Sequence, residues 1–245
     1  MTQPGSWHLG ILCAFDTETT GPDPETALVV SSCVAHVDGS GVIPPESETW
    51  LVDPGCEIPA EAAAVHGITT EQARANGEKP GPALNDISGA LVRSARSGIP
   101  VVAYNVPYDF TVLDRETRRH DLKPPFWDAF SAAHGYVIDP LVLDKHLDPY
   151  RKGSRTLAAA CEHYKVRIDG AHDAAADAIA AARVAWAIAA RHRRIAEMSL
   201  ADLHALQVQA KASQSRSFQE YLRRQGKADV IDGSWPLKAW MEAAA

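Results

Sequence analysis

The stretch of sequence that decides the fold is Leu9-Gly-Ile-Leu-Cys-Ala-Phe-Asp16-Thr-Glu18-Thr-Thr-Gly21. Its apolar run is continuous rather than alternating, which is typical of a central strand buried on both faces. Because the run stops at Asp16, we expect a carboxylate at the C-terminal end of that strand, with Glu18 two residues beyond it. A carboxylate beside an apolar core is costly unless a cation neutralises it. We therefore expect a pair of divalent metal ions at this point.

Strand and helix patterns continue outward from this stretch. Two further strands are predicted over residues 27–37 and 48–52, on either side of a turn rich in glycine and proline. Strands over 99–104 and 136–138 then alternate with helices. The predicted helices are a short one capped by Thr69 or Thr70 and longer ones over 82–97, 108–119, 156–164 and 174–196. This order predicts an α/β fold in which a mixed five-stranded sheet is flanked by helices on both faces.

Two more motifs bring polar side chains towards the end of that sheet. Asp109 follows the strand over 99–104 in Asn105-Val-Pro-Tyr-Asp-Phe, and active sites of α/β proteins gather where strands end. The third motif, His172-Asp-Ala-Ala-Ala-Asp177, opens the long alanine-rich helix. Residues five apart diverge by about 140° around a regular helix. We therefore expect Asp177 on the helix and His172 in the loop before it.

These residue types suit the hydrolysis of a phosphodiester bond. That reaction needs a nucleophilic water near neutral pH and relief of negative charge, and two metal ions about 4 Å apart supply both. Hard cations such as Mg²⁺ prefer oxygen ligands. We expect Asp16, Glu18, Asp109 and Asp177 to bind two divalent ions, Mg²⁺ or Mn²⁺, with a backbone kink that turns Asp16 and Glu18 to the same side. His172 is the candidate general base, because a histidine titrates at about pH 6.5.

In order and spacing the motifs resemble those of the DnaQ-like, or DEDDh, 3′-to-5′ exonucleases. This family has an RNase H-like fold and includes the proofreading subunit of the bacterial replicative polymerase. The resemblance runs over residues 9–189 and includes a further element, His66-Gly-Ile-Thr69. Each motif alone is common, but the set of them in this order is specific.

The resemblance implies a role for each motif residue. Asp16, Glu18 and Asp177 would bind the metal ion that holds the attacking water. Asp16, with Asp109 through a water, would bind the ion that faces the leaving group. His172, where a sister branch has tyrosine, would be the general base.

The resemblance also implies contacts with the end of the strand. Glu61 lies five residues before His66, as a glutamate does in the proofreading subunits. Glu61, His66 and the backbone around Thr19 would then hold the terminal nucleotide and its 3′-hydroxyl. A loop hydrogen bond is the alternative role for Glu61 and His66. Contacts of this kind explain cleavage from a free end, because the terminal sugar is recognised.

Residues beside the motifs have structural interpretations. Asn105 is expected to brace its turn through its side-chain amide rather than to contact the substrate. Asp139 and Asp173 are expected to support the site or to cap helices, and Asp173 suits the start of the long helix. Trp235 and Trp240 are expected to pack on the domain or on a second subunit rather than to stack on bases.

The chain of 245 residues, 46% of them hydrophobic, can bury a full core. The motifs end before residue 199, after which the sequence becomes polar and then basic and amphipathic. We therefore divide the chain into an exonuclease domain, residues 1–198, and a C-terminal extension, residues 199–245, that is helical or wraps the domain. Its function is open.

Cysteine spacing and hydropathy indicate where in the cell the protein works. Cysteines 13, 33, 56 and 161 lack the Cys-x-x-Cys spacing, which favours buried free thiols over disulfides or a zinc site. No apolar run reaches the roughly 18 residues of a membrane helix, and no secretory signal precedes the first strand. We expect a cytoplasmic protein that does not contact membranes.

The net charge of −7 hides an asymmetry. Residues 1–90 carry 13 acidic and 2 basic side chains, whereas residues 145–227 carry 15 basic and 8 acidic ones. The basic half could bind a phosphate backbone. For Arg191, Arg193 and Arg194 the alternative is a solvated helix end that the helix dipole favours.

We expect a metal-dependent exonuclease that removes nucleotides from the 3′ end of single-stranded or frayed nucleic acid, with DNA favoured over RNA. A ribonuclease that trims short RNA is the alternative within enzymes. A non-catalytic module that binds nucleic acid or a polymerase is the alternative outside them. The extension could contact a polymerase or a second copy of the chain, and the sequence leaves pathway and oligomeric state open.

Overall fold

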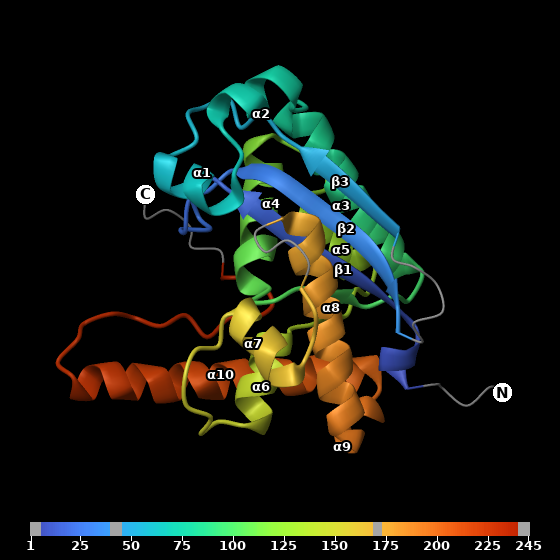
Figure 1. Ribbon diagram of the computed structural model, residues 1–245, viewed down its shortest axis with the longest axis vertical. Coiled ribbons are helices and arrows are strands. Elements are labelled where there is room, and N and C mark those ends of the chain that lie inside the picture. The colour runs from blue at the N-terminus through green and yellow to red at the C-terminus, as the bar shows by residue number, and fades with distance from the viewer. Residues whose placement is uncertain (1–5, 40–45, 169–172, 240–245) are drawn as a thin grey trace.

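A five-stranded mixed sheet lies at the centre of the computed structural model, which describes residues 6–39, 46–168 and 173–239. The strand order is β3-β2-β1-β4-β5 (Figure 1). The first three strands are antiparallel, and β4 and β5 continue the sheet in parallel with β1. The strands are β1 (Ile11–Thr19), β2 (Val29–Asp38), β3 (Glu46–Leu51), β4 (Val101–Val102) and β5 (Val137–Ile138). The predicted mixed sheet of five strands is confirmed.

Helices cover both faces of the sheet (Figure 1). On one face, α3, α4 and α5 bury an aromatic core in which Phe110 meets the rings of Phe15, Phe126 and Phe130. On the other face, α8 packs directly on β1 and β2 through alanines, whose small side chains permit a close approach. The helices are α1 (Ala60–His66), α2 (Thr70–Asn76), α3 (Pro80–Arg96), α4 (Pro107–Arg119), α5 (Phe126–Ala132), α6 (Pro140–Leu147), α7 (Leu157–Tyr164), α8 (Ala174–Arg191), α9 (Arg193–Ala196) and α10 (Leu200–Arg224), with a 3₁₀ turn over Trp7–Leu9.

Strand β1 is longer than the sequence predicted. We expected it to end at Asp16, but its pairing with β2 continues through Asp16 and Glu18 to Thr19. Since side chains alternate along a strand, Asp16 and Glu18 point to the same face without the predicted kink. The irregularity that does occur is a register shift between Glu18 and Thr19, after both carboxylates.

Other differences have local causes. The apolar segment over 99–104 contributes only two residues to the sheet, because β4 pairs with β1 only at Cys13 and Ala14. The helix predicted over 174–196 is interrupted at His192, whose extended ψ of 85° separates α8 from α9. Helix α1 was not predicted, because only the small, partly buried side chains of Ala62 and Ala63 pack on a hydrophobic cluster, which gives a weak apolar pattern. Cysteines 13, 33 and 161 are buried free thiols as expected, but Cys56 is exposed.

The C-terminal extension packs on the rest of the chain. Helix α10 crosses below the sheet and contacts α6 and β5, and the segment after it returns alongside α10 towards α4 (Figure 1). Trp235 in that segment is buried in the aromatic core, which confirms its predicted packing role. Trp240 lies outside the described residues. The boundary at residue 198 stays a prediction, and Leu203, Ala210 and Trp235 share the cores of the domain.

Within the described part of the chain, no helix is both long and apolar enough to cross a membrane.

Candidate active site

Three carboxylates from two elements meet above the middle of the sheet. Asp16 and Glu18 project from β1 towards α8, and Asp177 projects from the first turn of α8. One oxygen of each lies within 4.8 Å of an oxygen of the other two. Asp173 caps α8 by accepting a hydrogen bond from Ala175 N at 3.0 Å, which agrees with the predicted helix start.

Asp109 reaches the same region from the opposite face of the sheet. It lies in the first turn of α4 and is 4% exposed. Its Oδ1 accepts hydrogen bonds from the backbone N–H of Thr17 at 3.2 Å and from Thr17 Oγ1 at 2.7 Å. This contact is possible because the pairing of β4 with β1 stops at Ala14. The Asp109 carboxylate thus takes the position that a strand partner of β1 would have.

The electrostatics of the four carboxylates are unfavourable without a cation. Burial, followed by the charges of Asp109, Glu18 and Asp177, holds the pKa of Asp16 well above its usual range. Burial and the neighbouring carboxylates raise the pKa of Glu18 to about 7. Burial also raises the pKa of Asp109 to about 7, although the bond from Thr17 opposes this.

The donor set fits a divalent metal ion. Two unit charges about 5 Å apart repel by roughly 3 kcal/mol at an effective dielectric constant of about 20. Among the ion pairs formed by described residues, none involves Asp16, Glu18 or Asp109. Carboxylate oxygens are the ligands that Mg²⁺ and Mn²⁺ prefer. A divalent ion among Asp16, Glu18 and Asp177 would offset the repulsion.

The residues predicted to bind substrate have different surroundings. His66 ends α1, and its Nδ1 accepts a hydrogen bond from Ile68 N at 3.1 Å, so the proton of the neutral ring is assigned to Nε2. That Nε2 is buried beside the backbone of Thr19, and burial lowers the pKa of His66. Glu61 is exposed in the first turn of α1. His172 lies outside the described residues.

Sequence reasoning did not single out Thr17 and Tyr108. The hydroxyl of Tyr108 meets that of Thr19 and donates to the carbonyl of Gly21 at 2.5 Å, which fixes the turn after β1. The available signal was adjacency, since Thr17 separates the first two carboxylates and Tyr108 precedes Asp109.

The prediction for Asn105 was wrong in its detail. Asn105 adopts a left-handed φ of 66°, which its residue type tolerates. Within the described part of the chain, the contact that braces the turn runs from its backbone N–H to Asp139 Oδ1, at 3.0 Å, and not from its side-chain amide.

The basic end of α8 is partly engaged within the chain. Arg191 donates to the carbonyl of Tyr164 at 3.0 Å and lies over its ring, and Arg193 pairs with Glu197. Arg191 lies in the last turn of α8 and fits the helix-end interpretation. Arg193 is the first residue of α9, where the helix dipole does not favour a cation, so that interpretation does not hold for it.

Comparisons with known proteins point the same way as the motifs. A family model for RNase T, described as exonuclease, matches residues 13–185. An uncharacterised exonuclease of Escherichia phage 186 is 33% identical over 167 residues, which cover 66% of this chain and 80% of the phage protein. A DNA polymerase III subunit epsilon-like protein of Rhodobacter capsulatus is 33% identical over 138 residues, which cover 52% of this chain and 19% of that protein.

A solved structure of E. coli Exonuclease I in complex with a dT13 oligonucleotide superposes with a TM-score of 0.63 at 20% identity. The match covers 76% of this chain and 42% of Exonuclease I, and it shows the RNase H-like fold. The chain thus spans about a fifth of the epsilon-like relative and under half of Exonuclease I. Because the family model spans most of the chain, including the segments that carry Asp16, Asp109 and Asp177, the chain belongs to the DnaQ-like exonuclease family.

Proposed function

We propose that this chain is a metal-dependent 3′-to-5′ exonuclease that hydrolyses phosphodiester bonds from the 3′ end of single-stranded or frayed DNA and releases nucleoside 5′-monophosphates. The observation that carries the proposal is the group of carboxylates from Asp16, Glu18 and Asp177, with Asp109 braced beside it. Family membership supports the class of reaction.

The carboxylates would hold two divalent ions, Mg²⁺ or Mn²⁺. Asp16, Glu18 and Asp177 would ligate the first, and Asp16, with Asp109 through a water, would hold the second, while Thr17 fixes the Asp109 carboxylate. When bound, such ions lower the pKa of water and neutralise charge on the phosphate. His172 would take the proton of the attacking water. Its place in the sequence, directly before the Asp173 cap of α8, supports this assignment.

The end of the strand would be recognised beside β1. Tyr108 fixes the turn around Thr19, so that the backbone there offers polar groups in a set position. His66 borders this turn, and Glu61 lies at the other end of the same short helix. Glu61, His66 and the backbone around Thr19 would hold the terminal nucleotide and its 3′-hydroxyl.

DNA is proposed as the substrate because similar proteins are associated with DNA. Exonuclease I is crystallised with a DNA oligonucleotide, and the Rhodobacter relative is named for a DNA polymerase subunit. By analogy, a polymerase or a second copy of the chain could bind the extension after residue 198. RNA as the substrate is an outcome of the experiment below.

The first prediction concerns the activity itself. A time course on 5′-labelled single-stranded DNA and RNA of matched sequence should give a ladder that shortens from the 3′ end with Mg²⁺ or Mn²⁺ and not with EDTA, and DNA should be the faster substrate.

Asp16→Ala should reduce cleavage to the EDTA level with an unchanged circular dichroism spectrum, because it removes a ligand of both ions. A near-normal rate in Asp16→Ala contradicts the metal assignment. Nucleic-acid binding without any metal binding supports a non-catalytic module instead.

The second prediction concerns the general base. His172→Ala should lower kcat by about 10²- to 10⁴-fold, the range for a lost general base. Its Mn²⁺ affinity, measured by calorimetry, should stay near that of the wild type. A large loss of Mn²⁺ affinity makes His172 a metal ligand and removes it from the role of base.

The third prediction concerns pH and stability. The folded-state pKa values of about 7 for Glu18 and Asp109 exceed the unfolded values of about 4. A raised carboxyl pKa means that stability is lost as pH rises from about 4 through about 7. In EDTA, Tm should therefore fall between pH 5 and 7.5, and Mn²⁺ should reverse the fall by binding the ionised carboxylates.

Glu18→Gln is the matched control for this measurement, because it removes one titrating charge and keeps the shape of the side chain. It should show a smaller fall in EDTA and a smaller response to Mn²⁺. If Glu18→Gln follows the wild type in both respects, the raised pKa of Glu18 does not reflect a metal site.

A further inference from the structure

The turn that leads into α4 is held by a buried carboxylate that also contacts the C-terminal extension. Asp139 is fully buried, and its carboxylate accepts hydrogen bonds from Asn105 N at 3.0 Å and from Val106 N at 3.2 Å. Trp235 Nε1 donates to the same Oδ2 that accepts from Val106, at 3.4 Å. The backbone N–H of Asp139 donates to Gln207 on α10 at 2.6 Å. Two residues of the extension thus surround the group that fixes the turn.

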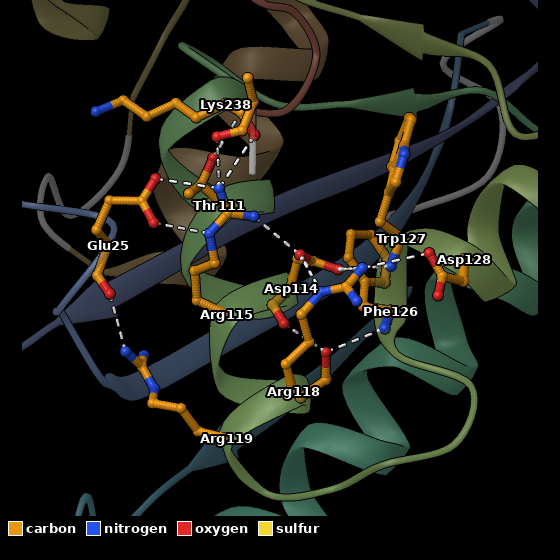
Figure 2. A network of polar contacts seen from close by, with 12 residues as sticks. Glu25, Thr111, Asp114, Arg115, Arg118, Arg119, Phe126, Trp127, Asp128 and Lys238 are labelled. Atoms are coloured by element: carbon orange, nitrogen blue, oxygen red, sulfur yellow. Dashed lines mark hydrogen bonds and ion pairs between the residues drawn. The ribbon is translucent and has the colours of Figure 1, made fainter. Parts of the chain in front are cut away.

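A second set of contacts joins the end of the extension to α4 itself. The backbone N–H of Lys238 donates to Thr111 Oγ1 at 3.0 Å, and that hydroxyl donates to the carbonyl of Pro107. Arg115 Nη2 donates to the carbonyls of Lys238 and Ala239 at 3.1 and 3.2 Å (Figure 2).

The same guanidinium connects the extension to the loop after β1. Arg115 is 3% exposed, pairs with Asp114 at 3.0 Å, and binds both carboxylate oxygens of Glu25 at 2.8 and 3.1 Å (Figure 2). Arg119 holds the backbone of that loop through the carbonyls of Glu25 and Ala27. The loop, the extension and α4 therefore share one network of charge-assisted hydrogen bonds.

We propose that the segment Trp235–Ala239 is a clasp that positions Asp109, with Trp235 and Asp139 as positioning residues. Asp109 lies four residues after Asn105, where the chain turns with a left-handed φ of 66° and the backbone N–H is held by Asp139. The clasp supports this turn and the helix after it from both sides, through Asp139 at the turn and through Thr111 in the next turn of the helix. It makes the extension a part of the catalytic domain and not a separate module. The inference rests on the proposed metal site for the meaning of Asp109.

Trp235→Phe tests the clasp, because phenylalanine fills most of the same space and lacks the Nε1 donor. Displacements of about 1 Å at a catalytic group can cost about 10²-fold in rate. We expect a fall of about tenfold or more in kcat, with KM for the strand little changed. We also expect weaker binding of Mn²⁺ to the free protein by calorimetry. Both readouts report on Asp109, whereas a role in folding alone would move only Tm.

Trp127→Phe is the matched control. Trp127 lies at the rim of the same aromatic core, stacked on Phe130 with ring centroids 6.0 Å apart, and its ring takes no part in the contacts of Asp139. This variant should lower Tm and leave kcat and Mn²⁺ binding as in the wild type. If Trp235→Phe keeps the kcat and the Mn²⁺ affinity of Trp127→Phe, the clasp does not position Asp109.

Thr111→Val keeps the test decisive if Trp235→Phe fails to fold. It removes the hydroxyl that joins Lys238 to Pro107 and leaves the aromatic core intact. The same combination of lower kcat and weaker Mn²⁺ binding is expected, and wild-type values in both overturn the proposal. A wild-type protein that binds Mn²⁺ without cleaving any strand would reject the proposed activity, while the Mn²⁺ affinities of the variants would still test the clasp.

Discussion

Repulsion among the carboxylates at Asp16 is the constraint on which the rest of this structure depends. Burial and mutual charge raise the pKa of Asp16, Glu18 and Asp109, so a fold that gathers these groups without a cation gives up stability. The surrounding scaffold holds them in place. Thr17 fixes Asp109, the strand period aligns Asp16 with Glu18, and the Asp173 cap sets the first turn of α8. Raised carboxyl pKa values of this kind cluster at functional sites.

The sheet allows the two halves of the site to meet. Asp16, Glu18 and Asp177 lie on the face that α8 covers, whereas Asp109 comes from α4 on the opposite face. They meet because β4 is only two residues long and leaves the edge of β1 open after Ala14. That opening makes the turn at Asn105 critical, and the extension is attached at this turn through Asp139. The C-terminal extension, which the sequence suggested was an appendage, is therefore connected to the turn that leads into α4 and Asp109.

The sequence predicted the sheet and the order of its motifs well, because apolar runs and capping residues are local signals. Thr69 caps α2 and Thr156 caps α7, as side-chain chemistry requires. Prediction from the sequence failed where the length of a strand is set by the strand it pairs with. The extent of β1 depends on β2, and the brevity of β4 depends on β1, neither of which a single segment reveals. The hydrogen bonds of Asp139 and Arg115 join residues about 30 and 90 positions apart in the sequence, so no local pattern could have indicated them.

The most direct test of the central claim is a crystal structure with Mn²⁺, with the ions located by their anomalous scattering. The account predicts one peak ligated by Asp16, Glu18 and Asp177, and a second peak next to it on the side of Asp109. If anomalous peaks elsewhere in the crystal show that manganese has entered it, an absence of manganese at Asp16 would contradict the account. The gathered carboxylates would then need an explanation other than metal binding.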